Sequence, residues 1–277
     1  MEVALALVAA FLFALGIVLQ GQVASQASEE ESTKADFLVE LARHPRWLVG
    51  NVADALGFVA QAGALALGKL VVVQPLLATS VVFALPLGAK LAGRRVSRRE
   101  IVAALALTAG LGAFLVLADP TGGVDNADAL EWIASFAICG GLSLALVVVA
   151  RGRSPARRAA LVGTAAGILF ALCAALTKTV VDQLGDGVLT VFEHWQLYAL
   201  LAVGWAAMTA SQRSLQAGTL APAVATQMAL NPIVSVALGV LAFEERIHDT
   251  TSTAVLALLA FAVMIAGLVV LAVIQQD

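Results

Sequence analysis

Charged residues are scarce in this chain. Only 13% of its 277 residues are Asp, Glu, Lys or Arg, whereas 61% are hydrophobic. Soluble domains are about 25% charged and about 45–50% apolar, and a compact soluble fold of this size could not hide so much apolar surface. The scarcity of charge therefore excludes a soluble enzyme, a disordered chain and a nucleic-acid-binding protein.

Cysteines and catalytic motifs are scarce as well. Cys139 and Cys173 are the only cysteines, and each lies inside an apolar run, so we predict small buried hydrophobes and neither a disulfide nor a metal site. The sequence contains no Walker motif, metal triad or nucleophile elbow. We expect neither an enzyme nor a bound cofactor.

Long apolar runs make up most of the sequence. A membrane-spanning helix needs about 20 mostly apolar residues, and nine runs meet this length. The first run lacks a basic start, so we expect a retained span and not a signal peptide. The runs are Val3–Gln20, Trp47–Ala66, Val71–Ala92, Glu100–Leu117, Ala129–Val149, Ala156–Asp182, Trp195–Ser214, Thr219–Ala242 and Ser252–Ile274. They predict an all-α polytopic protein with nine transmembrane helices, embedded in the lipid bilayer of the cell membrane.

The basic residues predict the orientation. The membrane side on which the loops after the first, third, fifth and seventh runs lie, with the run ends beside them, carries 13 of the 16 Lys and Arg residues. Basic loops stay on the cytoplasmic side, so the N-terminus is expected outside and the C-terminus in the cytoplasm. The segment at 27–46 has acidic residues early and basic residues late, which fits a short cytoplasmic surface helix or a flexible loop.

Two parts of the chain resemble each other. Leu12-Phe-Ala-Leu15 recurs as Leu169-Phe-Ala-Leu172, and five residues between Leu65 and Ala92 recur 150 positions later. We predict a first repeat of four helices at 1–120, a linking helix and loop at 121–155, and a second repeat of four helices at 156–277. Five helices separate the starts of the repeats, so the second enters the membrane from the opposite side. Inverted repeats of this kind are typical of secondary transporters.

Short motifs add a family resemblance. Asn231-Pro232 and Phe243-Glu-Glu-Arg246 resemble the Ser/Asn-Pro and Gly-Glu-Arg signatures of the EamA-like drug/metabolite transporter superfamily. Nine helices, an outside N-terminus and Val71-Val-Val-Gln-Pro75 are most similar to its NIPA-type magnesium-transporter branch. That branch carries Gly-Glu-x-x-Asn in the second helix, where this chain has Gly57-Phe-Val-Ala-Gln61 and an acid one turn earlier. The resemblance implies Mg²⁺ as the substrate.

One acid is predicted deep in the membrane. Asp54 lies seven residues after Trp47, about 10 Å below the interface at about 1.5 Å per residue. Intramembrane acids are costly, so they indicate function by default. Asp54 and Gln61 share one helix face, with Asn51 one turn before. Asp54 is predicted to be a cation (metal) ligand or a proton-coupling carboxylate; the alternative is a structural acid bonded to Asn51 or to a neighbouring helix.

Uncharged polar residues complete the predicted site. They are expected near mid-depth, where they would bind substrate or join neighbouring helices: Gln74, Thr79 and Ser80 in the third run, and Thr226, Gln227 and Asn231 in the eighth. Lys178 is expected to pair with Asp182 four residues later. Two small-residue motifs, Gly163-x-x-x-Gly167 and Ala106-x-x-x-Gly110, predict close helix packing, with a homodimer contact as the alternative.

These features predict a secondary transporter or facilitator of a small polar solute or divalent cation, working by alternating access. A proton-coupled drug or metabolite exporter is the first alternative, and a non-transporting membrane scaffold is the second.

Overall fold

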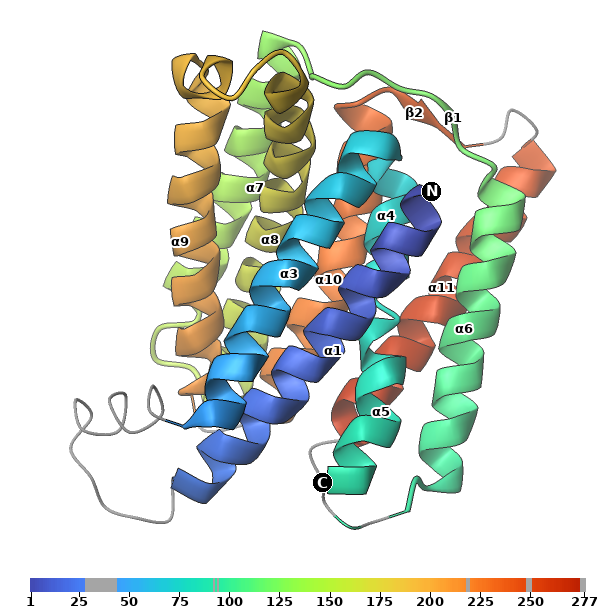
Figure 1. The fold of residues 1–277 in the computed structure, drawn as a ribbon, viewed down its shortest axis with the longest axis vertical. Coiled ribbons are helices and arrows are strands. Elements are labelled where there is room, and N and C mark those ends of the chain that lie inside the picture. Colours follow the sequence, from blue (N-terminus) through green and yellow to red (C-terminus); the bar gives the residue numbers. More distant parts are fainter. Residues whose placement is uncertain (28–43, 92, 94, 218–219, 248–250, 275–277) are drawn as a thin grey trace.

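The structure, a computed structural model, describes residues 1–27, 44–91, 93, 95–217, 220–247 and 251–274. Apolar helices run side by side through the molecule (Figure 1). The helices are α1 Glu2–Ala27, α3 Pro45–Leu67, α4 Leu70–Leu77, α5 Ser80–Leu91, α6 Arg98–Ala118, α7 Ala129–Val149, α8 Pro155–Gly185, the 3₁₀ turn η1 Thr190–Glu193, α9 Trp195–Leu215, α10 Leu220–Leu241 and α11 Thr251–Ile274.

The helices confirm a polytopic membrane protein. Within the described ranges, eight segments are long and apolar enough to cross a membrane, with α4 and α5 together forming one of them. The remaining predicted run, the seventh, forms α9, a helix of 21 residues. It falls outside this group because polar residues such as Gln196, Gln212 and Arg213 lower its hydropathy. The predicted surface segment at 27–46 falls mostly outside the described residues.

The third predicted span is broken in the middle, although the sequence predicted one continuous run. α4 ends at Leu77 and α5 begins at Ser80. The amides of Ala78 and Thr79 bond three residues back, to Pro75 and Leu76, and the Thr79 hydroxyl also donates to the Leu76 carbonyl at 2.6 Å. A 3₁₀ turn therefore separates two half-helices.

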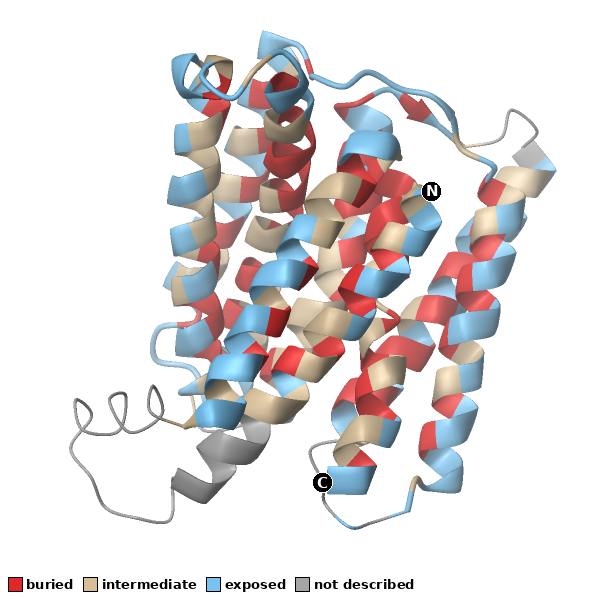
Figure 2. Cartoon of the chain, in the orientation of Figure 1, coloured by how far each residue is buried: buried red, intermediate tan, exposed pale blue. Residues whose placement is uncertain are grey.

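Helix packing depends on small residues. α8 packs against α7, α9 and α10. Buried residues follow its inward face (Figure 2), and many of them are alanine. A Cβ on Gly163 would lie 2.5 Å from the Ala223 carbonyl of α10, and one on Gly167 would lie 2.7 Å from the Gln227 carbonyl. The Gly163/Gly167 motif thus serves packing within the chain.

The α6 and α11 helices form a second close pair. A Cβ on Gly110 of α6 would lie 2.5 Å from the Met264 amide nitrogen, and a Cβ on Gly267 of α11 would lie 2.6 Å from the Leu107 amide nitrogen. Gly267 and Met264 follow Gly110 and Leu107 by the same 157 positions. The contact is therefore reciprocal, since each helix offers the other the same two positions.

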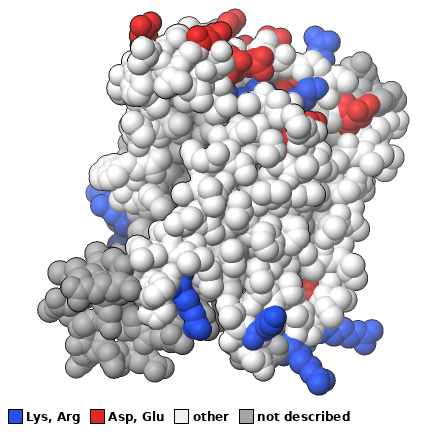
Figure 3. All heavy atoms as spheres, in the orientation of Figure 1, with Lys and Arg blue, Asp and Glu red and all other residues white. Residues whose placement is uncertain are grey.

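A short antiparallel sheet closes one end of the molecule. β1, Thr121–Gly122, follows α6, and β2, Glu245–Arg246, follows α10; Thr121 pairs with Arg246 and Gly122 with Glu245. α1 begins at this end and α11 finishes at the other (Figure 1). Acidic side chains gather at the sheet end and basic ones at the opposite end (Figure 3).

Candidate functional site

Asp54 lies between α3 and α1. Its side chain is half-buried, and its Oδ2 accepts a hydrogen bond of 2.6 Å from Nε2 of Gln20 in α1. A Cβ on Gly16 would overlap the carboxylate, at 2.6 Å from Asp54 Cγ. The acid therefore occupies space that Gly16 leaves free, and it faces a helix.

The α1 and α3 backbones approach each other because glycine occurs along their contact. A Cβ on Gly50 would lie 2.9 Å from Gln20 Cγ, and one on Gly57 would lie 3.0 Å from the Phe13 ring. Close approach at glycine is the usual packing device of membrane helices. It brings Gln20 within hydrogen-bond reach of Asp54.

The α3 residues predicted to share a helix face with Asp54 differ in their exposure. Asn51 is exposed and donates to the Trp47 carbonyl at 2.8 Å, so it does not bond Asp54. Phe58 is also exposed, whereas Gln61 is half-buried. Of the two partners named for a structural acid, Asn51 or a neighbouring helix, the structure has the neighbouring helix, because the Asn51 amide satisfies the carbonyl one turn earlier on its own helix. Gln20 has that role.

The polar residues of α4 and α5 lie at or near the helix break. Gln74 is 2% exposed, and its Nε2 has no hydrogen-bond partner among the described residues. Thr79 is buried and bonded to backbone, and Ser80 is half-buried. Buried amides without partners are rare in proteins, so Gln74 marks a point where water or a ligand could bind.

Of the three predicted polar residues of α10, Thr226 bonds another helix. Thr226 donates to the Pro222 carbonyl at 2.8 Å and reaches the Ala160 carbonyl of α8 at 3.1 Å. Asn231 accepts from the Ser235 hydroxyl at 3.3 Å, and Gln227 is half-buried. α10 packs against α4 as well as α8, so the two predicted polar groups lie on helices in contact with each other.

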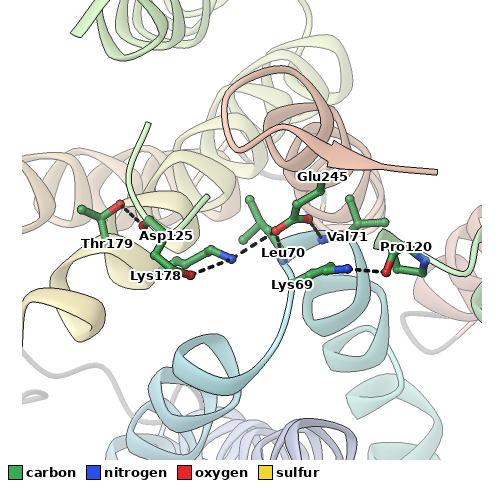
Figure 4. A network of polar contacts seen from close by, with 8 residues as sticks. All are labelled: Lys69, Leu70, Val71, Pro120, Asp125, Lys178, Thr179 and Glu245. Atoms are coloured by element: carbon green, nitrogen blue, oxygen red, sulfur yellow. Dashed lines mark hydrogen bonds and ion pairs between the residues drawn. The ribbon is translucent and has the colours of Figure 1, made fainter. Parts of the chain in front are cut away.

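A second polar centre lies at the sheet end (Figure 4). Glu245 is fully buried, and its two carboxylate oxygens each accept a hydrogen bond of 2.8 Å, from the amides of Leu70 and Val71. Its Oε1 also lies 3.3 Å from Lys178 Nζ. A carboxylate at a helix N-terminus satisfies free amides and complements the helix dipole, so Glu245 binds the start of α4 to the loop after α10.

Lys178 connects this centre to a third element. It is 5% exposed, lies 3.9 Å from Asp125 Oδ1 and has its ammonium 5.5 Å from the Phe243 ring centroid. The prediction that Asp182 is the main partner of Lys178 was wrong, because the loop after α10 brings Glu245 to the Lys178 ammonium. The apolar stretches beyond Thr177 and Thr179 were a sequence signal that Lys178 is buried.

Further bonds surround the pair. Thr179 donates to the Asp125 carbonyl at 3.2 Å, and Lys69 donates to the Pro120 carbonyl. Lys69 is beside the start of α4, and Pro120 and Asp125 flank β1 (Figure 4). The loops after α3, α6 and α10 are thus linked to α8 at this end.

The described side chains offer limited material for a metal site. In the parts of the chain described, no group of three or more His, Cys, Asp or Glu could hold a metal ion. Both cysteines are free; Cys139 is buried and Cys173 is half-buried. Two hollows of about 700 Å³ each lie between α6 and α11 and beside the starts of α7 and α9; none of the nine predicted binding residues lines either.

Comparison with known proteins gives one informative match. The chain is 30% identical over 251 residues to an uncharacterized protein of Corynebacterium glutamicum, and the match covers 89% of this chain and 86% of the relative. No protein-family model matches the chain, and no solved structure matches it.

Proposed function

The chain belongs to one family with the corynebacterial protein, and from that premise we propose that it is a secondary transporter of a small polar solute or a divalent cation. It works by alternating access between two inverted repeats, α1 to α6 and α8 to α11. Mg²⁺ is the first substrate to test, because the motif resemblance implies it.

The reciprocal contact of α6 with α11 is the observation that carries this proposal. Gly110 meets Met264, and Gly267 meets Leu107, at one constant offset of 157 positions. A contact in which each partner offers the same patch has the form of a two-fold interface. Leu12-Phe-Ala-Leu15 recurs at this same offset, which supports a two-fold relation between the halves.

Helix boundaries and a second contact support the same relation. Pro45 and Leu70, the first residues of α3 and α4, precede the first residues of α9 and α10 by 150 positions. Gly16 faces Asp54 in the first half, and in the second half Cys173 Sγ lies 3.9 Å from the Cβ position of Gly204. Those residues follow Gly16 and Asp54 by 157 and 150 positions.

The Glu245–Lys178 centre supports a state closed at the sheet end. Its hydrogen bonds and ion pair join α8 and the loops after α3, α6 and α10. An opening at this end would have to separate buried partners, so closure here is a discrete state. By the distribution of basic residues this end faces outside, and the protein is closed to the outside.

Asp54 is the proposed coupling or ligand residue. A hydrated Mg²⁺ needs only one or two carboxylates because it keeps several waters, and the carboxylate of Asp54, which accepts a hydrogen bond from Gln20 Nε2, meets that need. The same single carboxylate can instead carry a proton. This observation favours the proton-coupled drug or metabolite exporter as the second candidate function.

The test is a flux assay in proteoliposomes. Vesicles containing a Mg²⁺ dye, and separate vesicles containing a pH dye, are compared for wild type and Asp54→Asn. The proposal expects Mg²⁺ entry that falls at least tenfold in the variant. Unchanged Mg²⁺ flux in Asp54→Asn would exclude Asp54 as the ligand, and solute-dependent proton flux without Mg²⁺ entry would favour the exporter. The absence of both fluxes, with intact folding, would favour the scaffold.

A further inference from the structure

A groove runs between α6 and α11 at the basic end of the molecule. Its volume is about 700 Å³. Ala103 and Gly267 are buried at its floor, and exposed valines such as Val102, Val263 and Val270 form its walls. Small residues create the groove, because the two helices meet at Gly267 and have little side-chain volume beside the contact.

The groove matches the depth of one lipid leaflet. On α6 it extends from Arg98 to Ala106 and on α11 from Ile274 back to Val263, which is about 12 Å and about 16 Å at about 1.5 Å per residue. Half of a hydrocarbon core is about 15 Å. An acyl chain in this groove would therefore lie alongside the helices for most of its leaflet.

Positive charge lies at the mouth of the groove. Arg98 and Arg99 line it from the first turn of α6, and both are exposed. Their acidic neighbour Glu100 is buried and accepts the amide of Ser97 at 2.6 Å. Throughout its range, Thr251–Ile274, α11 contains no charged residue. Among the described residues that line the groove, the charged side chains at the mouth are therefore both positive, and an apolar channel lies directly behind them.

We propose that this groove is a binding site for an anionic phospholipid. One acyl chain lies between α6 and α11, and the headgroup phosphate pairs with the guanidinium groups of Arg98 and Arg99. Arginine suits this role because its planar fork binds phosphate through two hydrogen bonds, and basic clusters at the inner membrane surface select anionic lipids.

Native mass spectrometry of the full chain in detergent tests the site. The protein is titrated with dioleoyl phosphatidylglycerol, with dioleoyl phosphatidylcholine, and with glycerol 3-phosphate, which has a phosphate but no acyl chain. We expect about tenfold tighter retention of the anionic lipid than of the zwitterionic one, the order that two interfacial arginines provide, and no retention of glycerol 3-phosphate.

Two pairs of matched variants locate the binding. The double variant Arg98→Gln/Arg99→Gln is compared with the double variant Arg157→Gln/Arg158→Gln. Both pairs of arginines are exposed in the first turns of helices. Ala266→Phe fills the groove, and Ala262→Phe adds the same bulk one turn earlier at an exposed position outside its lining. We expect Arg98→Gln/Arg99→Gln to remove the preference for the anionic lipid, and Ala266→Phe to remove lipid binding. The two control variants should retain both properties.

Several results would overturn the proposal. Equal retention of the two lipids, or an equal loss in the Arg157/Arg158 variant, would reduce the effect to general surface charge. Unchanged lipid binding in Ala266→Phe would exclude the groove. A dimer that forms without lipid and disappears in Ala266→Phe would assign the groove to a second copy of the chain instead.

Discussion

At the scale of the residue, the Asp54 carboxylate depends on the absence of a side chain at Gly16. The carboxylate fills the volume that a Cβ would take and is held there by Gln20. Intramembrane acids persist where they face protein or water and have a partner. The identity of residue 16 is thus as important to this site as that of residue 54.

The first prediction follows from this contact. Gly16→Ala forces the carboxylate away from Gln20, and overpacking of this kind destabilises by about 1–3 kcal/mol. Thermal unfolding in detergent measures the loss. Gly112→Ala is the matched control, because nothing lies within 4 Å of its Cβ position. The double variant Gly16→Ala/Asp54→Ala should recover stability; a double variant as unstable as Gly16→Ala alone would show that Asp54 is not the obstacle.

The second prediction concerns the buried ion pair. Lys178→Met leaves the fully buried Glu245 carboxylate with its two amide donors and no cation. Removing one partner of a buried pair costs about 3–5 kcal/mol, so we expect a large fall in unfolding temperature. Adding Glu245→Gln removes the unpaired charge and should restore part of the stability. Additive losses in a double-mutant cycle would mean that the two side chains are not coupled.

At the scale of the element, α6 and α11 pack through two equivalent glycines. Gly110→Ala and Gly267→Ala each place a methyl group within 2.6 Å of a backbone nitrogen on the facing helix. The third prediction is that both variants lose stability by similar amounts, about 1–3 kcal/mol. Gly140→Ala and Gly141→Ala in α7 have open space at the new Cβ and should be neutral. Strongly unequal losses at Gly110 and Gly267 would argue against a two-fold relation.

Element boundaries were predictable because their signals are local. The range Ala129–Val149 is the same in prediction and structure, and the predicted Trp195–Ser214 differs from α9 by one residue. Ser97 precedes α6 with the capping-box hydrogen bonds that its spacing to Glu100 predicts. The break after Leu77 was missed, because proline within a membrane helix is compatible with either a bend or an interruption.

The partners of the polar residues could not be predicted in the same way. Asp54 was identified from its depth, but its bond to Gln20 spans 34 positions and depends on how α1 approaches α3. The Lys178–Glu245 bond spans 67 positions. Periodicity reports which face of a helix a residue occupies, whereas helix approach and loop path decide what that residue meets.

At the scale of the whole molecule, charge is distributed unequally between the two ends (Figure 3). The fourth prediction is an outward sheet end, because basic loops are retained in the cytoplasm. In a background without Cys139 and Cys173, an impermeant maleimide should label Asp186→Cys in intact cells. It should label Arg151→Cys only after lysis; both positions are exposed. The reverse labelling pattern would invert the orientation and put the Glu245–Lys178 centre on the cytoplasmic side.

The two halves are alike in packing and unlike in chemistry. Asp54 and Gly16 correspond by position to Gly204 and Cys173. The carboxylate packed against a glycine in the first half therefore has a thiol packed against a glycine, with no charge, as its counterpart in the second half. Turning the molecule over in the bilayer would therefore move Asp54 toward the other side without placing an equivalent acid at its former position. In the proposed orientation, which the basic loops set, the acid of this contact lies nearer the cytoplasmic side, and the neutral pair is its counterpart in the other half.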